Sequence, residues 1–342
     1  MARYRKQKTF TELPGLFDEL EIDMTGKAKQ PHTSTIGGEK VVNKPIGNDA
    51  TKINRNAITN PDKIYFITLG SGSSGNCSYI GDSDNGFLID AGVDLKKVVD
   101  GLNANGIPME RVKAIVLTHD HGAHVRYAYT ILRKYRHIKL FCTLRALNGI
   151  LRRHSISRRI KDYHSPIYKE TPFKLAEFTL TAFEVSHDGT DNAGFFIEYG
   201  NMRFTIVTDT GYITDRADHY LRQADYIMIE SNYDLEMLQN GVYPEYLKAR
   251  ILSQTGHLDN VVAARYISDI YTPTLKYVFL CHLSNDNNSP EIALHVMRNA
   301  LEKKNVSIGD GSGSITSRQA ALQLVALPRY DTSLLYVLRK DD

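Results

Sequence analysis

Apolar and polar positions alternate with a period of two through much of the chain after residue 62. Alternation of this kind, or a short apolar run bounded by Gly, Asn, Asp or Ser, is typical of β-strands. The pattern predicts strands over residues 63–69, 77–80, 87–90, 112–117, 138–142, 178–185, 194–199, 203–208, 225–230, 276–281, 322–327 and 333–338.

A helical period separates many of these runs. Apolar residues three and four positions apart predict a long helical stretch after His124 and helices over residues 94–103, 213–222, 244–252, 259–271 and 290–303. Strand pairs come first, helices are interleaved, and strands return at the end. This order predicts an α/β protein with two mixed sheets and helices outside them, rather than a regular βαβ alternation.

Residues 1–60 differ from the rest and predict an N-terminal extension to a single domain over residues 61–342. The extension is rich in Lys, Asn, Thr, Pro and Gly and has no sustained period. One apolar island lies within residues 10–24, where four positions share a single helical face: Leu13, Leu16, Phe17 and Leu20. Two interpretations stay open, a leader that packs loosely on the body or a docking segment for a partner or a second subunit.

Composition narrows the class of protein. The chain has 342 residues, is 42% hydrophobic and 24% charged, and so can bury a core without disulfides or a structural metal. Its three cysteines are far apart and form no CxxC pair, which favours a reducing compartment. No apolar run approaches the roughly 18 residues of a membrane helix, and no secretory signal is visible. We therefore expect a cytoplasmic protein without a membrane partner.

The segment at 118–124, THDHGAH, holds three histidines within six residues directly after an apolar strand. In extended chain, side chains at positions i and i+2 point the same way, so His119 and His121 can share a metal ion. His124 lies three residues further on, where a helix is expected to begin, and can reach a neighbouring metal. Neutral imidazole is the commonest metal ligand in proteins, so this spacing predicts a metal site.

Further ligands are expected at the ends of other apolar strands. His187 follows the strand at 178–185, Asp209 follows the strand at 203–208, and His282 follows the strand at 276–281. A single polar residue at a strand end is more often a cap or a turn residue. Several such ends, each carrying a residue type that zinc or manganese prefers, together predict one site.

The order of these residues resembles the metallo-β-lactamase superfamily: His-x-His-x-x-His, then a strand-end His, Asp and His. The strand ending at Asp90 is similar to that family's first motif, whose Asp hydrogen-bonds the site without binding metal. Over residues 64–300 the chain resembles the YycJ-type branch, regarded as cytoplasmic DNA exonucleases or phosphodiesterases. The segments that carry this resemblance are LGSGSSGN at 69–76, VSHD at 185–188, TDTGY at 208–212, IESNYD at 229–234, GHL at 256–258 and CHLSNDNN at 281–288.

The resemblance implies an αββα four-layer sandwich and two divalent metals, with zinc favoured and manganese the alternative. It implies that one metal is bound by His119, His121 and His187. The other would be bound by His124 and His282, with Asp209 bridging the two metals.

One residue departs from the family motif, because Ala123 stands where the family has an Asp that binds the second metal. Asp120 is adjacent to His119 and should point away from the site. Three ligands and a water still suffice for a catalytic zinc. Loss of the carboxylate favours zinc over manganese and leaves open that the second site is weak or empty.

Residues 70–75 satisfy the pattern GxGxxG after a strand, which is also a dinucleotide-binding signature. That signature requires a helix to follow, whereas residues 76–80 continue as a strand. We therefore expect a hairpin turn whose glycines supply positive φ angles.

Charge is distributed unevenly. Between Arg126 and Lys161 there is no acidic residue and there are eleven basic ones. A solvated helix face is the plain interpretation, but a field of one sign near the predicted metal site also attracts a phosphate backbone. The expected nucleic-acid contacts are Arg126, Arg133, Lys134, Arg152, Arg153, Arg158 and Arg159.

These features together predict a metal-dependent phosphodiesterase, a nuclease acting on DNA rather than RNA through hydroxide formed at the metals. Asp209 and His257 are the expected catalytic residues, with His257 supplying a proton to the leaving group or binding phosphate. Two alternatives stay open. The first is a non-catalytic nucleic-acid-binding scaffold, which Ala123 would suit, and the second is a hydrolase of a small cyclic ester, lactone or lactam.

Overall fold

The computed structural model describes residues 63–340. The predicted N-terminal extension, with its candidate docking segment at residues 10–24, lies outside the described residues. Within residues 63–340, none of the helices has the length and apolar character that crossing a bilayer requires.

The first sheet has seven strands in the order β15-β1-β2-β3-β4-β5-β6. Its first strands form an antiparallel meander, and β3, β4, β5 and β6 run parallel to one another. The bounds are β1 Ile64–Gly72, β2 Gly75–Gly81, β3 Gly86–Ile89, β4 Val112–Val116, β5 Lys139–Cys142, β6 His164–Pro166 and β15 Tyr336–Leu338.

The second sheet has eight strands in the order β13-β14-β12-β11-β10-β9-β8-β7. Strands β10, β11, β12 and β14 are parallel, so their carboxyl ends meet at one edge of the sheet. The bounds are β7 Phe173–Leu175, β8 Phe178–Glu184, β9 Ala193–Tyr199, β10 Met202–Val207, β11 Tyr226–Glu230, β12 Tyr277–Cys281, β13 Ile308–Gly309 and β14 Leu322–Ala326.

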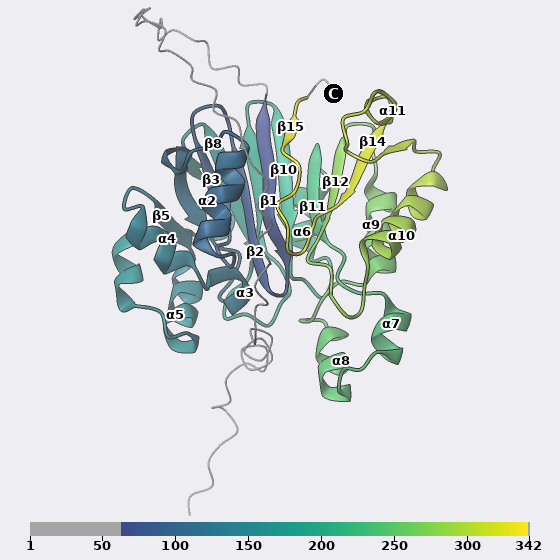
Figure 1. The fold of residues 1–342 in the computed structure, drawn as a ribbon. Coiled ribbons are helices and arrows are strands. Elements are labelled where there is room, and N and C mark those ends of the chain that lie inside the picture. The colour runs from purple at the N-terminus through teal and green to yellow at the C-terminus, as the bar shows by residue number, and fades with distance from the viewer. Residues whose placement is uncertain (1–62, 341–342) are drawn as a thin grey trace, which may run out of the picture. The chain divides into compact units, whose positions relative to one another are not determined.

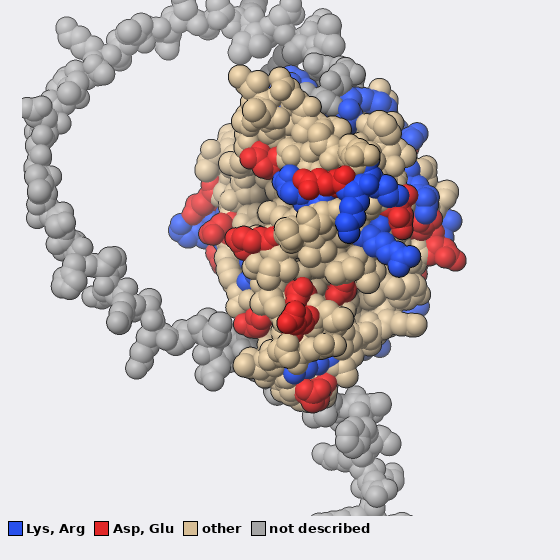
Figure 2. All heavy atoms as spheres, turned by 90° about the vertical axis from the view of Figure 1, so that its right-hand side faces the viewer, with Lys and Arg blue, Asp and Glu red and all other residues tan. Residues whose placement is uncertain are grey.

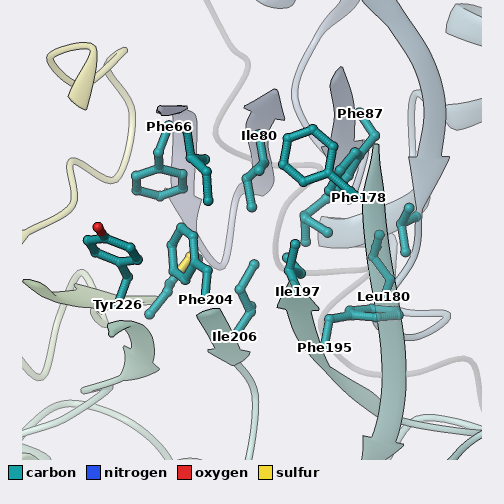
Figure 3. Packing of buried hydrophobic residues seen from close by; sticks show 14 of the residues in the cluster. Phe66, Ile80, Phe87, Phe178, Leu180, Phe195, Ile197, Phe204, Ile206 and Tyr226 are labelled. Carbon is teal, nitrogen blue, oxygen red and sulfur yellow. The ribbon is translucent and has the colours of Figure 1, made fainter. Parts of the chain in front are cut away.

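The two sheets pack face to face through large apolar side chains (Figure 3). Phe66 of the first sheet contacts Phe204 and Phe279 of the second, with ring centroids 5.1 and 4.7 Å apart. Phe87 likewise packs edge-on against Phe178 at 5.4 Å. Offset and edge-on aromatic pairs of this kind stabilise a core beyond their buried area. The packed sheets form a rigid support for the loops at their edges.

Helices cover the outer face of each sheet (Figure 1). The first sheet is covered by α2 Leu95–Ala104, α3 Gly122–Val125, α4 Ala128–Lys134 and α5 Leu144–Arg153. The second is covered by α6 Asp215–Leu221, α9 Asn260–Ile270 and α10 Pro290–Glu302. The shorter elements are η2 Met109–Arg111, η3 Arg158–Tyr163, α7 Leu235–Asn240, α8 Glu245–Ile251 and α11 Ile315–Arg318. This confirms the predicted four-layer αββα sandwich.

Two local predictions were wrong. The long helix expected after His124 is divided into α3 and α4, because the chain turns at residues 126–127 to bring Ala91 into hydrogen bonds with both segments. The β1–β2 hairpin forms as expected, but its glycines have no positive φ. They allow close approach instead: a side chain at Gly72 would overlap Arg329, and one at Gly75 would meet the Gly92 carbonyl oxygen at 2.6 Å.

Candidate metal centre

The structure brings His119, His121 and His187 together at the edge where strands of both sheets end. His119 follows β4, His121 precedes α3, and His187 lies between β8 and β9. His121 Nδ1 lies 3.0 Å from His119 Nε2 and 3.2 Å from His187 Nε2. Ligand atoms of a tetrahedral zinc, bound at about 2.0–2.1 Å, lie roughly 3.3 Å apart. The three imidazoles therefore have the spacing of a metal-binding group.

The Asp209 carboxylate lies between this group and His124. Its Oδ2 is 3.6 Å from His187 Nε2, 3.8 Å from His119 Nε2 and 3.4 Å from His124 Nε2. Asp209 follows β10, is almost fully buried, and also takes part in possible metal-binding groups with His124 and with His257. One carboxylate in this position can contact two adjacent cations.

His124 is oriented by two side chains. Asp90 Oδ2 lies 2.7 Å from His124 Nδ1, and the same carboxylate accepts hydrogen bonds from the backbone and hydroxyl of Thr118. On the other side of the ring, the amide nitrogen of Asn76 lies 3.1 Å from His124 Nε2. The Asp90 contact leaves Nε2 facing Asp209 and Asn76, and a metal bound there would replace the Asn76 contact.

His282 lies beside Asp209 but is grouped with different residues. Its Nδ1 is 3.5 Å from Asp209 Oδ1 and 2.8 Å from Glu230 Oε1. The group that could hold a metal here is His282, Glu230 and His257, whereas His124 is grouped with His119 and Asp209. The backbone N–H of His282 donates to Ser71 Oγ at 3.0 Å, which ties it to the β1–β2 hairpin.

Glu230 is a site residue that the sequence prediction missed. It is fully buried at the end of β11, and its Oε1 lies 2.7 Å from His257 Nδ1 as well as contacting His282. Its Oε2 accepts backbone N–H groups from Thr210 and Leu258. A polar residue ending an apolar strand was the signal used for Asp209, and it applied equally to Glu230.

Three residues that end strands here adopt the left-handed conformation: Asp90, Asp209 and His282, with φ of 63°, 49° and 53°. This conformation is unfavourable for residues other than Gly, and Asp tolerates it better than most. Such strain persists only where the surrounding structure holds it, and it is concentrated at functional sites.

Ala123 and Asp120 lie as their sequence positions suggested. The Ala123 carbonyl packs against Gly92, where any side chain would overlap it. The Asp120 side chain points away from the histidines and accepts hydrogen bonds from the backbone and hydroxyl of Thr190, at 2.8 and 2.6 Å. Asp120 therefore does not supply the carboxylate that is absent at position 123.

The ionisation of the first three histidines and of Asp209 favours metal binding. Burial lowers the pKa of His119, His121 and His187, so these imidazoles are neutral at neutral pH. Burial opposes ionisation of Asp209, but the neighbouring charges of His282 and His124 hold its pKa well below the usual range. For His257, burial also opposes the charged form, but the charge and hydrogen bond of Glu230 raise its pKa. Neutral imidazoles and an ionised carboxylate are the states that bind a cation.

The cations predicted to contact nucleic acid are all exposed: Arg126, Arg133, Lys134, Arg152, Arg153, Arg158 and Arg159. Arg126 lies two residues after His124 in sequence. Arg153 Nε lies 3.6 Å from Asp120 Oδ2, on the carboxylate that points away from the histidines. The face that carries α9 and α10 differs, because acidic and basic side chains lie next to one another there (Figure 2). Lys304 and Arg298, for example, pair with carboxylates on that face.

Comparison with known proteins agrees with this geometry. Residues 85–282 match the family model described as "Beta-lactamase superfamily domain". The chain is 31% identical to exodeoxyribonuclease YycJ of Bacillus anthracis, over 72% of this chain and 92% of that protein. The chain belongs to the metallo-β-lactamase superfamily. Exodeoxyribonuclease WalJ of Streptococcus pneumoniae strain D39 is also 31% identical, over 71% of this chain and 90% of that protein.

Solved structures show the same fold at lower identity. Zinc-bound PqqB from Methylobacterium extorquens superposes with a TM-score of 0.57 at 17% identity, covering 79% of this chain and all of that one. YhfI from Bacillus subtilis superposes with a TM-score of 0.54 at 14% identity, covering 81% of this chain and all of that one. Membership of the superfamily and the buried His and Asp groups identify a metal-binding hydrolase with the ligand groups of a two-metal site.

Proposed function

We propose that the protein is a metal-dependent phosphodiesterase that acts as a nuclease on DNA. The observation that carries the proposal is the position of the Asp209 carboxylate, 3.4–3.8 Å from imidazole nitrogens of two histidine groups. Two cations held close together on either side of a carboxylate form the arrangement that stabilises both the attacking and the leaving oxygen of a phosphodiester.

His119, His121 and His187 are the proposed ligands of one metal. His124, Asp209 and His282 are the proposed ligands of the other. His282 suits this role because its Nδ1 faces Glu230, which leaves Nε2 for a metal. Imidazole-rich ligands favour zinc, and the absence of a carboxylate at position 123 makes manganese the second choice.

Bound divalent cations would lower the pKa of a coordinated water towards neutrality and act as Lewis acids on the phosphate. The chain's own residues supply the proton for the leaving group. Because Glu230 binds His257 through Nδ1, the remaining proton of the charged imidazole is at Nε2. His187, Asp209 and His257 have ligand atoms within 4.8 Å of one another, so His257 lies where it can protonate a departing alkoxide.

DNA is the proposed substrate for two reasons. The relatives named exodeoxyribonuclease match most of the chain at 31% identity. In addition, the exposed arginines and lysines of residues 126–161 begin two residues after His124. Cations in this position can hold a phosphate backbone near the metals. The three cysteines are buried free thiols, which agrees with the cytoplasmic location that we propose.

The test combines metal analysis with digestion of labelled linear DNA by purified protein. Two metals per chain and release of nucleotides are expected, with His121→Ala losing one metal and the activity. Unchanged metal content in His121→Ala would contradict the ligand assignment. Metal binding without turnover on DNA would favour a nucleic-acid-binding scaffold, which Ala123 suits, and turnover only on a lactone or lactam would favour the small-ester alternative.

A further inference from the structure

A small cavity lies beside the β1–β2 hairpin and is lined by cations from three distant parts of the chain. Its volume is about 140 Å³, and the cations are Lys97 in α2, Arg126 after α3 and Arg329 after β14. Among the described residues that line it, the only carboxylate is Asp94, which accepts the backbone N–H of Lys96. The lining therefore has a net positive charge.

Both arginines have fixed positions beside the hairpin. The Arg329 side chain fills the space that a side chain at Gly72 would need, and its guanidinium donates to Asn285 Oδ1 at 2.5 Å and to the Asn288 carbonyl oxygen at 3.5 Å. Arg126 Nη1 lies 3.4 Å from the Ser74 carbonyl oxygen. Guanidinium groups fixed in this way lose less conformational freedom when they bind an anion than free surface side chains do.

The cavity adjoins the candidate metal centre. Gly92, in the cavity wall, donates its N–H to the Asn76 carbonyl oxygen at 2.9 Å. The Asn76 amide in turn lies 3.1 Å from His124 Nε2, and the His124 carbonyl oxygen accepts the N–H of Ala91 at 2.7 Å. One residue thus separates the cavity from a proposed metal ligand.

The size and charge of the cavity select its ligand. Pockets that enclose a drug-sized molecule measure about 300–1,000 Å³, so a whole nucleotide is too large for this one. A volume of about 140 Å³ is well below that range and suits a compact group. Two guanidinium groups and an ammonium group favour phosphate among compact anions, because Arg binds its oxygens in pairs.

We propose that this cavity binds the phosphate next to the one that is cleaved, in the strand held at the metal centre. The proposal rests on the proposed phosphodiesterase function and adds a second phosphate position to it. The bound group is either an internal phosphate of the strand or a phosphate at its end. Lys97 makes the position testable because its neighbour Lys96, in the same helix, pairs with Asp100 and does not line the cavity.

The first experiment measures binding of a fluorescent single-stranded oligothymidylate across a range of salt concentrations, with chelator present so that the strand stays intact. Loss of one phosphate contact lowers the magnitude of the slope of log affinity against log salt by about 0.7 for single strands. Lys97→Gln is expected to show this change and a several-fold weaker affinity. The matched control Lys96→Gln is expected to bind as the wild type does. An unchanged slope in Lys97→Gln, or an equal loss in both variants, overturns the proposal.

A second experiment separates the cavity from the proposed function. Bis(4-nitrophenyl) phosphate has a single phosphate and cannot fill a neighbouring position. The ratio of DNA cleavage to cleavage of this ester should fall several-fold in Lys97→Gln and stay constant in Lys96→Gln, and a constant ratio in both overturns the proposal. If the wild type cleaves neither substrate, the proposed function fails, while the salt slopes still decide the cavity. If Lys97→Gln cleaves only 5′-phosphorylated or only 3′-phosphorylated strands more slowly than the wild type does, the cavity binds a terminal phosphate. If it cleaves all strands more slowly, the cavity binds an internal phosphate.

Discussion

Replacing Glu230 by Gln tests whether one carboxylate sets the state of both His257 and His282. The wild-type Oε1 lies 2.7 and 2.8 Å from the Nδ1 atoms of these histidines, and Oε2 accepts two backbone N–H groups. A glutamine has one oxygen, and turning it towards the backbone donors leaves its NH2 group facing both imidazoles. Each imidazole must then accept at Nδ1, which leaves a ring proton at Nε2, and in His282 Nε2 is the atom proposed to bind metal.

The size of the effect follows from these contacts. A hydrogen bond to a charged group contributes about 1.5–3 kcal/mol, so losing two lowers the free energy of unfolding by at most roughly 3–6 kcal/mol. The change of tautomer recovers part of this lost free energy. At about 2–4 °C per kcal/mol, the midpoint temperature of thermal unfolding should fall by roughly 5–10 °C. Affinity for the second metal, the one that we propose is bound by His124, Asp209 and His282, should fall about 10–100-fold. Loss of a proton donor should lower kcat by about 10²–10⁴-fold.

The assay compares Glu230→Gln with Asp225→Asn by metal titration, thermal unfolding and kcat as a function of pH. Asp225 is a buried carboxylate just before the other end of β11, where it accepts the Arg203 N–H at 2.9 Å. The raised pKa of His257 keeps it protonated to higher pH, so wild-type kcat should decline only as pH rises through that raised value. In Glu230→Gln the decline should begin at lower pH. If Glu230→Gln loses stability as Asp225→Asn does but keeps wild-type metal affinity and pH dependence, Glu230 is structural and the reasoning fails.

Three further predictions concern the metals and DNA. Ala123→Asp should tighten the second metal about 10–100-fold, seen as full nuclease activity at lower metal concentration, and an unchanged requirement would contradict this. Despite burial, the charges of Asp209 and Asp90 raise the pKa of His124 to about 10 in the metal-free protein, so the second metal must displace a proton. At pH values below about 10, the affinity for this metal should therefore rise about tenfold for each unit by which the pH increases. Calorimetry in several buffers counts the protons released on binding, and a count of zero would refute this prediction. Four exposed arginines should contact DNA: Arg152, Arg153, Arg158 and Arg159. Replacing all four by Glu should weaken DNA binding and flatten the dependence of affinity on salt, whereas an unchanged dependence would mean that DNA binds another surface.

Strand alternation was sufficient to predict part of the geometry at these strand ends. It placed His119 and His121 on one side of the chain and turned Asp120 away, and the structure has this arrangement. The ends of parallel strands necessarily meet at one sheet edge, which is why Asp209 and His282 lie 3.5 Å apart despite their separation in sequence. Residue pattern and topology together therefore predicted which strand ends meet.

Contacts between segments could not be predicted in this way. Asn76 lies in the hairpin, and its approach to His124 depends on the packing of Gly92 against Ala123. The hairpin glycines illustrate the same limit, because a glycine required for close approach looks the same in sequence as one required for positive φ. The division of the helix after His124 likewise depends on hydrogen bonds to Ala91, more than thirty positions earlier.

The left-handed backbone of Asp90, Asp209 and His282 has a consequence for how the sequence changes after gene duplication. Each of these residues holds a conformation that glycine adopts without penalty and that costs other residues about 1–2 kcal/mol. At Asp209, replacement by Gly would remove a buried charge and relieve that cost together, whereas at Asp90 it would also leave the Thr118 N–H and hydroxyl without their acceptor. A duplicated gene released from selection for activity is therefore expected to lose the Asp209 side chain first, with a gain in thermal stability. Inactive paralogues of this fold are expected to carry Gly or Asn at this strand end and to outlast the active form on heating.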